Sequence, residues 1–362
     1  MLFPYTYVPH QMEKMQEFID FIFTEVWCNA PNGLVFHPDL FQGNPDLQQV
    51  ISEFGFSQKA PVRGKLFYED VKSIYEHFAL LTAQEIDQFK KWYQGNNDIE
   101  KVCANDPAAQ LVRYVDIPSA HETLCNQLAS FFQGLYSSSL LELAALKAKI
   151  GGINECYLAF VQTNDEGKCP FCGIADLLGE HHRPKREAFD HYLPKSLYPF
   201  NSINLRNLVP TCHHCNSSYK TVKDPAHEST DPPHAAARRK VFYPYRTDAP
   251  KIVVSVSLAH PDIDTLKSEE ISFKFGPAAL SEELNTWRDV YGIDVRYRAK
   301  LLGKNDGKYW LEQALGECSN LGKKPADVVA AVNQLAAVKP FAECNFLRSA
   351  FVQACYQAGT LA

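Results

Sequence analysis

The two C-x-x-C pairs of this chain constrain its folding more than any other feature. They are Cys169-Pro-Phe-Cys172 and Cys212-His-His-Cys215, and 39 residues separate them. Two thiolates at this spacing on a tight turn can bind one ion at about 2.3 Å, and two such turns complete a tetrahedron. The sequence therefore predicts a structural Zn²⁺ held by all four sulfurs, with no coordination position left for a substrate.

Other interpretations of these cysteines are a redox-active C-x-x-C motif or two disulfides. The remaining seven of the 11 cysteines lie in apolar helical patterns, which is typical of small buried hydrophobic residues in a reducing cytosol. His213 and His214 are alternative ligands, although four thiolates already satisfy Zn²⁺. We expect loss of the ion to unfold this segment.

Length and charge give weaker constraints. The 362 residues suffice for two or three domains. No stretch approaches the roughly 20 apolar residues of a membrane span, and the N-terminus lacks the pattern of a signal peptide, so we expect a cytoplasmic protein without a membrane partner. The net charge is −6, yet Cys169 to Arg246 holds 11 Lys+Arg against 7 Asp+Glu and seven of the 12 histidines. This local basic excess favours a phosphate-binding site near the cysteines.

The hydrophobic pattern predicts an α+β chain with three regions. Residues 1–152 are expected to be mainly helical, because apolar residues between Met15 and Val26 recur at helical spacing. Capping boxes at Thr82-x-x-Glu85 and Ser119-x-x-Glu122 predict two further helices. The second of these should run to about residue 150, with a break near Gly134, and stop at a Gly-Gly pair.

Residues 153–248 form the predicted central module with the cysteines, and residues 249–362 the predicted α+β C-terminal region. The stretch Lys223–Ala235 contains Pro225, Pro232 and Pro233 and is expected to be an exposed loop. Alternation predicts strands over 252–258 and 271–275. Helical spacing follows over 284–291 and again over 325–361.

The residues between the two cysteine pairs carry a second pattern. It consists of Asp190-His191-Tyr-Leu-Pro194, Asn207-Leu208 and an asparagine, Asn216, directly after the last cysteine. In order and spacing this segment resembles the HNH nucleases of the His-Me finger superfamily, whose fold is a zinc-braced ββα-metal module. The tail Phe242-Tyr-Pro-Tyr245 is also similar to that of stand-alone HNH proteins. The resemblance covers this segment and not the flanking regions.

The resemblance implies a role for each of these residues. His191 would be the general base, since an imidazole titrating near neutrality can take a proton from water. Asp190 and Asn216 would bind a catalytic Mg²⁺ or Mn²⁺, hard ions that prefer oxygen ligands. Asn207 would hold the histidine in place. Many members have histidine where this chain has Asn216, a change that disfavours softer ions but not activity.

Two further expectations concern this segment. Lys195, Arg206 and Lys220 flank it and are candidate phosphate contacts, with solvated surface charge as the equal alternative. Neighbouring residues on a strand point to opposite faces, so we expect a local distortion at Asp190-His191 that lets both side chains serve one site.

The predicted function is that of a metal-dependent endonuclease acting on DNA, with RNA as an alternative substrate. The layout resembles nuclease subunits of bacterial anti-phage systems such as Septu, in which an ATPase partner gates the nuclease, so the flanking regions would dock a partner. A double-strand cut would need two events or a homo-oligomer. The alternative function is a zinc-stabilised nucleic-acid-binding or adaptor protein without catalysis.

Overall fold

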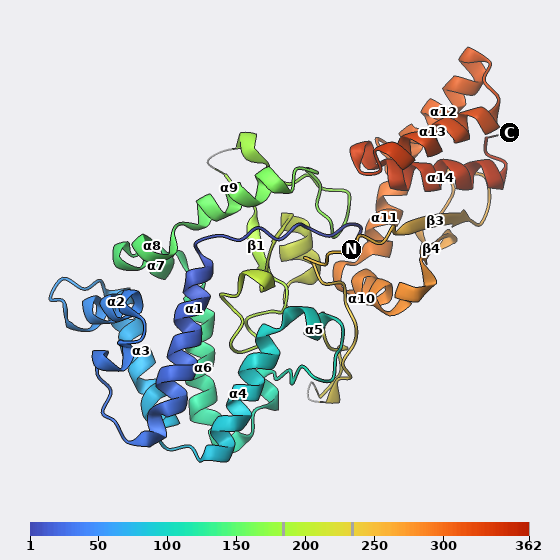
Figure 1. Ribbon diagram of the computed structural model, residues 1–362. Coiled ribbons are helices and arrows are strands. Elements are labelled where there is room, and N and C mark those ends of the chain that lie inside the picture. Colours follow the sequence, from blue (N-terminus) through green and yellow to red (C-terminus); the bar gives the residue numbers. More distant parts are fainter. Residues whose placement is uncertain (183–184, 233–234, 362) are drawn as a thin grey trace.

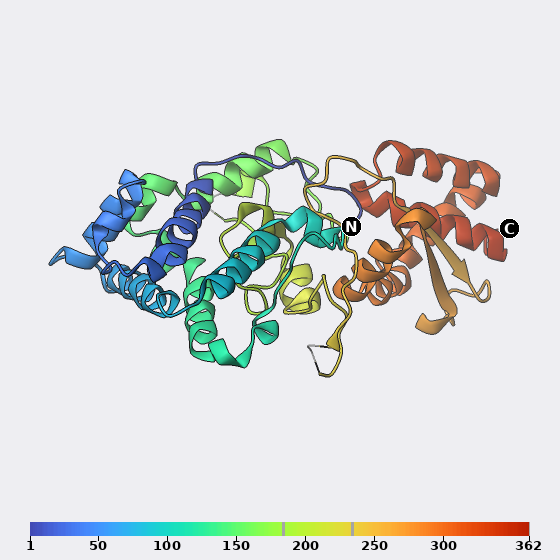
Figure 2. The same cartoon turned by 60° about the horizontal axis from the view of Figure 1, so that its bottom comes forward.

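The computed structural model describes residues 1–182, 185–232 and 235–361. The molecule is elongated, as Figures 1 and 2 show: helices of the first 150 residues form one end, residues 253–358 form the other, and the cysteine-bearing segment lies between them. Helices dominate, and the strands of the described residues form two small antiparallel sheets. The predicted α+β composition with a mainly helical N-terminal region is confirmed.

The elements follow the chain in this order. The helices are α1 Glu13–Phe21, α2 Pro45–Phe56, α3 Val62–Phe78, α4 Ala83–Asn97, α5 Ile99–Cys103, α6 Glu122–Leu135, α7 Ser138–Leu141, α8 Ala144–Ile150, α9 Ile153–Thr163, the short π-helix η8 His214–Lys220, α10 Ser281–Tyr291, α11 Ile293–Leu302, α12 Gly307–Leu321, α13 Pro325–Val338 and α14 Asn345–Ala358. The strands are β1 Ala188–His191, β2 Leu208–Thr211, β3 Val253–Leu258 and β4 Ile271–Gly276.

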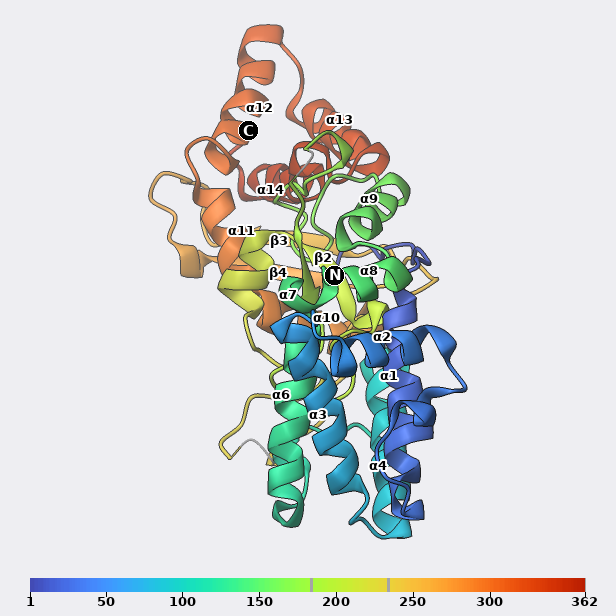
Figure 3. The ribbon, with the colours of Figure 1, turned by 90° about the vertical axis from the view of Figure 1, so that its left-hand side faces the viewer.

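In the N-terminal region, α1, α3, α4 and α6 run side by side around an aromatic core (Figure 3). Trp27 lies at its centre, fully buried. Its indole N–H donates to the carbonyl of Val71 at 2.9 Å, and its ring stacks on Phe78. The capping box predicted at Thr82 is confirmed, since Thr82 and Glu85 exchange hydrogen bonds at the start of α4.

The helix predicted from Ser119 to about Ile150 is three helices. Ser119 lies in a 3₁₀ turn that spans Ser119–His121, so α6 begins only at Glu122 and has no side-chain cap. The expected capping box is therefore wrong. The first break follows Leu135, next to the predicted one at Gly134. The predicted stop at the Gly-Gly pair is confirmed, because Gly151 leaves the helix at φ +74°.

The sheet of β1 and β2 is the centre of the middle segment. Asp190 pairs with Val209, and His191 pairs with Leu208 in antiparallel register. All of β2 is buried. Tyrosine hydroxyls anchor it, since Tyr245 donates to the carbonyl of Leu208 at 2.6 Å. The helix η8 follows β2 directly.

The C-terminal region contains the predicted strands, confirmed as the antiparallel pair β3–β4. Helix α14 packs against β3 and against α13. The stretch 325–361, expected to be amphipathic throughout, is divided between α13 and α14. In the predicted loop the described residues 223–232 form no helix or strand. Pro233 lies outside the described residues.

One buried apolar core runs through all three regions. The first residues of the chain contribute to it: Met1, Leu2 and Tyr5 are buried, and the segment crosses the molecule from α1 towards α10 (Figure 1). The proposed boundaries at 152 and 248 stay a prediction. Within the described part of the chain, no helix has the length and apolar character needed to cross a bilayer.

Candidate metal centre and catalytic site

The four cysteines of the two C-x-x-C pairs meet in one buried cluster. Their sulfurs all lie within 4.8 Å of one another. Cys169 Sγ and Cys215 Sγ are 3.7 Å apart, and Cys172 Sγ and Cys212 Sγ are 4.0 Å apart. Ligands of a tetrahedral ion with bonds of about 2.3 Å stand about 3.8 Å from each other. The cluster therefore has the dimensions of a closed four-sulfur metal site, and none of the cysteines forms a disulfide.

Tight turns present each pair of sulfurs. In the first, the N–H of Gly173 donates to the carbonyl of Cys169 at 2.7 Å. Gly173 has φ +65°, and a Cβ there would meet Leu2 and Phe346 at less than 3 Å, so only glycine fits. In the second turn, the N–H of Asn216 donates to the carbonyl of Cys212 at 3.0 Å. This bond places the start of η8 directly at the cysteine cluster.

Helices α10 and α11 brace the cluster from the C-terminal region. Arg296 donates to Cys215 Sγ at 3.0 Å, Tyr297 donates to the carbonyl of Cys172 at 3.0 Å, and Trp287 donates to the carbonyl of Phe171 at 2.7 Å. Burial opposes the charge of Arg296, but the nearby sulfurs of Cys215 and Cys172 raise its pKa further above the ordinary value. Arg296 therefore places a cation beside one sulfur, and Tyr297 and Trp287 hold the backbone of the turn that carries Cys172.

Asn207 ties the loop that follows His191 to the start of β2. It is fully buried. Its Oδ1 accepts from the N–H of Leu193 at 2.8 Å, and its Nδ2 donates to the carbonyls of Leu193 at 3.1 Å and Asn201 at 3.2 Å. All three hydrogen bonds of this side chain are therefore made to backbone groups of the loop.

His191 is held by this loop. Its Nε2 lies 2.9 Å from the carbonyl of Ser202, and its ring meets that of Tyr136 edge to face at 4.8 Å. A carbonyl only accepts hydrogen bonds, so Nε2 carries the proton and Nδ1 keeps a free lone pair. Burial, with the charge of Lys195, lowers the pKa of His191 to about 3. The imidazole is therefore neutral at physiological pH.

Asp190 faces η8, and its partner there is Lys220. Lys220 Nζ donates to Asp190 Oδ1 at 3.0 Å and to the carbonyl of His191 at 2.8 Å. Both side chains are buried, and Asp190 Oδ2 has no hydrogen-bond partner among the described residues. Burial raises the pKa of Asp190, and the Lys220 charge opposes that rise. Lys220 was expected as a phosphate contact at the surface. Its ammonium is instead buried and bound to Asp190 and to the backbone of His191.

The distortion expected at Asp190-His191 is absent from the strand. Both residues pair in register with β2, and their side chains contact different elements, η8 and the α6–α7 junction. The strand ends at His191, and the loop after it, rather than a bulge in the strand, brings the Ser202 carbonyl to the ring.

The other predicted site residues lie on the surface side. Asn216, partly exposed, stands four residues before Lys220 in η8. Lys195 donates to the carbonyl of Gln133 at 2.9 Å, and burial lowers its pKa. Arg206 is exposed, and its guanidinium lies over the ring of Tyr7 at 4.2 Å. Arg206 also lines a cavity of about 730 Å³, together with Tyr5, Tyr7 and Arg246.

Residues that the sequence did not single out complete the surroundings of His191. Tyr136 comes from the N-terminal region, and burial raises its pKa to about 12 although Arg186 opposes the rise. Arg186, five residues before His191, supplies the charge that opposes this rise, and it donates to Asn154 Oδ1 at 3.0 Å. The basic run before β1 would have indicated Arg186. No local signal links Tyr136 to a histidine 55 positions later.

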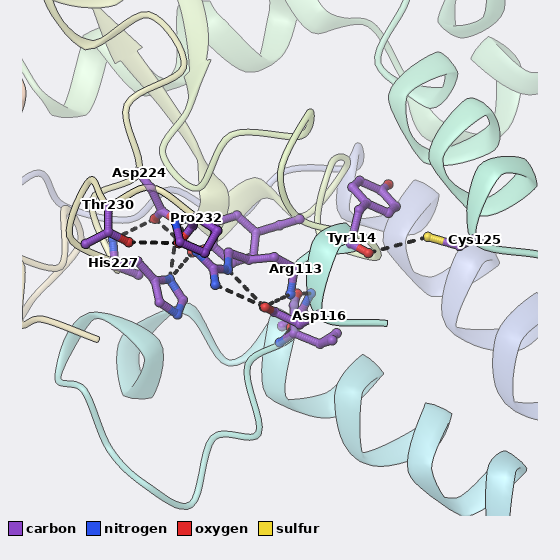
Figure 4. A network of polar contacts seen from close by, with 12 residues as sticks. Arg113, Tyr114, Asp116, Cys125, Asp224, His227, Thr230 and Pro232 are labelled. Atoms are coloured by element: carbon purple, nitrogen blue, oxygen red, sulfur yellow. Dashed lines mark hydrogen bonds and ion pairs between the residues drawn. The ribbon is translucent and has the colours of Figure 1, made fainter. Parts of the chain in front are cut away.

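A second polar network links the segment after η8 to the loop between β1 and β2, beside Arg113 of the N-terminal region (Figure 4). The hydroxyl of Tyr198 lies 2.6 Å from Asp224 Oδ2 and 2.8 Å from Nδ1 of His227. Beside it, Arg113 binds both carboxylate oxygens of Asp116 at 2.8 and 3.0 Å. Burial opposes ionisation of Asp224, yet its bonds to His227 and Tyr198 hold its pKa below the ordinary value. The network fixes the loop next to Lys220.

Comparisons of the chain with protein-family models, with curated proteins and with solved structures find no match.

Proposed function

We propose that the protein is a metal-dependent endonuclease of the HNH type that hydrolyses phosphodiester bonds of DNA. The observation that carries the proposal is the state of His191: its Nε2–H is fixed on a backbone carbonyl, which leaves Nδ1 unprotonated and without a partner among the described residues. An imidazole oriented in this way is a general base. The order β1, β2, η8 supports a ββα-metal module around it.

In the proposed reaction, Nδ1 of His191 takes a proton from the water that attacks phosphorus. The lowered pKa keeps the ring neutral in the free protein, and the negative charge of a bound phosphodiester would raise that pKa towards the range in which a general base works. Asn207 holds the loop, and the Ser202 carbonyl holds the ring, so the base is positioned before substrate binds. Lys195, Arg186 and the exposed Arg206 would contact phosphate oxygens.

The residues next to His191 fit a hard divalent cation. Asp190 Oδ2 is a buried carboxylate oxygen without a donor among the described residues, and an ion would satisfy it. The amide oxygen of Asn216 is the second ligand in the proposal. A bound Mg²⁺ or Mn²⁺ supplies positive charge that stabilises the departing 3′ oxygen.

The four-sulfur cluster is proposed to hold a structural Zn²⁺. Its dimensions and complete protein ligand set support this ion over a catalytic one. Dialysis against a zinc chelator should release one equivalent of zinc and lower the melting temperature, because both turns and η8 depend on the cluster. A protein that keeps its melting temperature after the metal is removed would contradict a structural role.

A plasmid-cleavage assay with Mg²⁺ or Mn²⁺ tests the activity. The substitution His191→Ala should reduce cleavage at least about a hundredfold, as expected for loss of a general base, with zinc content unchanged. His37→Ala, exposed and in the N-terminal region, is the matched control and should cleave like the wild type. Cleavage that survives His191→Ala would overturn the proposed mechanism. Assays on RNA and on both DNA forms determine the substrate class.

The flanking regions are proposed to dock a protein partner, such as the ATPase of a cytoplasmic anti-phage system. Their size supports this, since residues 1–152 and 249–362 far exceed what the site itself needs. Co-expression with the candidate ATPase should yield a stable complex. Full cleavage activity of the protein alone, as a monomer or homo-oligomer, would count against gating by a partner.

One observation favours a second candidate function, a zinc-stabilised nucleic-acid-binding or adaptor protein. Lys220 already occupies one oxygen of Asp190, and Tyr136 covers one edge of the His191 ring. A protein that binds DNA with the same affinity with and without Mg²⁺ or Mn²⁺, and cuts nothing, would establish this alternative.

A further inference from the structure

Lys220 is an internal cation placed at the residue that the proposed function assigns to the catalytic metal. It is fully buried, and its Nζ is bound to Asp190 Oδ1 at 3.0 Å and to the carbonyl of His191 at 2.8 Å. Helix η8 ends at Lys220, and Asn216 lies four residues earlier in the same helix. The ammonium thus stands between the strand that carries Asp190 and the helix that carries Asn216.

The charges around Asp190 are already balanced before any metal binds. The carboxylate and the Lys220 ammonium form a neutral pair inside the protein. Lys195 and Arg186 add positive charge on the His191 side. A divalent cation that approaches this neutral pair gains little attraction and must still lose part of its hydration. The protein alone is therefore a poor site for the ion.

A phosphodiester changes this balance, because its negative charge would lie next to the base that acts on it. The phosphate also brings oxygen atoms, the ligands that Mg²⁺ and Mn²⁺ prefer. Asp190 Oδ2, which Lys220 leaves without a partner, remains free to face the ion. The substrate would then complete both the charge and the ligand set.

We infer that Lys220 makes divalent-metal binding at Asp190 conditional on a bound phosphodiester. Lys220 is a positioning residue in this scheme: it holds Asp190 and the His191 backbone, and its charge keeps the free enzyme without a tightly bound metal. By linkage, metal and nucleic acid raise each other's affinity by the same factor. The inference rests on the proposed function, since it names how that site is regulated.

The test measures Mn²⁺ binding by electron paramagnetic resonance, with and without a short DNA duplex, in the His191→Ala background that does not cut. The duplex should raise Mn²⁺ affinity at least about tenfold, and Mn²⁺ should raise duplex affinity equally. Lys220→Gln removes the charge but retains a donor for the His191 carbonyl. It should bind Mn²⁺ without DNA at least about tenfold more tightly than the Lys220 protein, so the effect of DNA shrinks.

Matched variants separate charge from folding. Lys220→Arg retains the charge and should keep the coupling, whereas Asp190→Asn should bind no Mn²⁺ at this site in either state. Zinc content and near-ultraviolet circular dichroism report whether each variant is folded. Should Lys220→Gln not fold, the absence of coupling between Mn²⁺ and DNA in the Lys220 protein would still overturn the inference.

The outcomes distinguish the inference from the function on which it rests. Equal Mn²⁺ affinity with and without DNA, in a protein that cleaves plasmid through His191, would overturn the inference and leave the nuclease proposal standing. Mn²⁺ binding in no state, together with no cleavage, would refute both.

Discussion

At the scale of single residues, Asn207 shows how one side chain fixes a loop that the secondary structure leaves free. Between β1 and β2 the chain has 16 residues, Tyr192 to Asn207, without a strand. Asn207 satisfies three backbone groups of that loop from a fully buried position. Backbone groups buried without partners are costly, so the loop depends on this amide.

The substitution Asn207→Ala should lower the free energy of unfolding by about 2–4 kcal/mol, because it leaves buried donors and acceptors unpaired. Urea denaturation measures the change. Asn126→Ala, on the exposed side of α6, should change stability by less than about 0.5 kcal/mol. Equal effects of the two substitutions would show that the loop is held by other contacts.

Asp224 gives a residue-scale prediction about pH. Its folded pKa lies below the unfolded value of about 3.9, since hydrogen bonds and His227 outweigh burial. The stabilisation is therefore complete above pH 3.9 and is lost as the pH falls through the lowered folded pKa. Asp224→Asn should cost about 1–3 kcal/mol at pH 7 and progressively less below about pH 4. Comparing the two proteins at each pH cancels the effect of zinc loss in acid.

Urea denaturation of both proteins between pH 7 and pH 3 measures this difference. Asp165→Asn, at an exposed position, is the control and should change stability by less than about 0.5 kcal/mol. A difference for Asp224→Asn that stays constant down to pH 3 would contradict the assigned role of the carboxylate.

At the scale of elements, α11 contacts the four-cysteine cluster although it lies about 80 residues beyond Cys215. Arg296 donates to Cys215 Sγ at 3.0 Å, and its guanidinium lies over Tyr219 of η8 at 4.5 Å. Charge near a coordinating sulfur stabilises the thiolate form, and such outer contacts change metal affinity by about 10- to 100-fold. Arg296→Met should therefore weaken zinc binding by this factor in a chelator competition.

Arg298→Met is the matched control for that measurement. It removes the same charge from the same helix, but its side chain bonds the carbonyl of Ile271 instead of a sulfur. Zinc affinity should stay near that of the wild type. A similar loss of zinc in both variants would mean that α11 acts only through general stability.

The elements also show what the sequence could and could not predict. Spacing alone located the cysteine cluster and strands β3 and β4, because both depend on local periodicity or on a fixed ligand geometry. The start of α6 was mispredicted, since the helix begins at Glu122 and not at Ser119. Its end lies next to the predicted break, but the packing of Tyr136 there against His191 joins distant segments. Local propensity carries no information on such contacts.

The same limit applies to the candidate site. The chemistry that the pattern around Asp190 and His191 predicts stays a prediction. The structure shows that Asn207 is buried and that its Oδ1 accepts from the N–H of Leu193 in the loop after His191. The burial of Lys220 could not be predicted from the sequence. A lysine near a basic segment is expected to be a solvated surface charge unless its carboxylate partner, here Asp190, is known. Burial of a charge pair is a property of the assembled module.

At the scale of the whole molecule, the first seven residues join parts that the sequence treats as separate. The N–H of Leu2 donates to the carbonyl of Pro170 beside the first cysteine turn, and the ring of Phe3 meets that of Phe341 at 4.5 Å. Tyr5 donates from its hydroxyl to the carbonyl of Pro210 in β2. The segment therefore contacts the cysteine cluster, the central sheet and the C-terminal region together.

Tyr5 provides a graded test of this connection. Tyr5→Phe removes one buried hydrogen bond and should cost about 1 kcal/mol, whereas Tyr5→Ala also removes a ring packed on Phe160 at 4.7 Å and should cost about 3–5 kcal/mol. Because the core is continuous, Tyr5→Ala should speed hydrogen exchange in both β2 and α11. Tyr309→Ala, nearly half exposed at 48%, should leave both unchanged. Faster exchange in β2 alone would mean that the C-terminal region folds independently, and the three regions would then be separate units joined only by the chain.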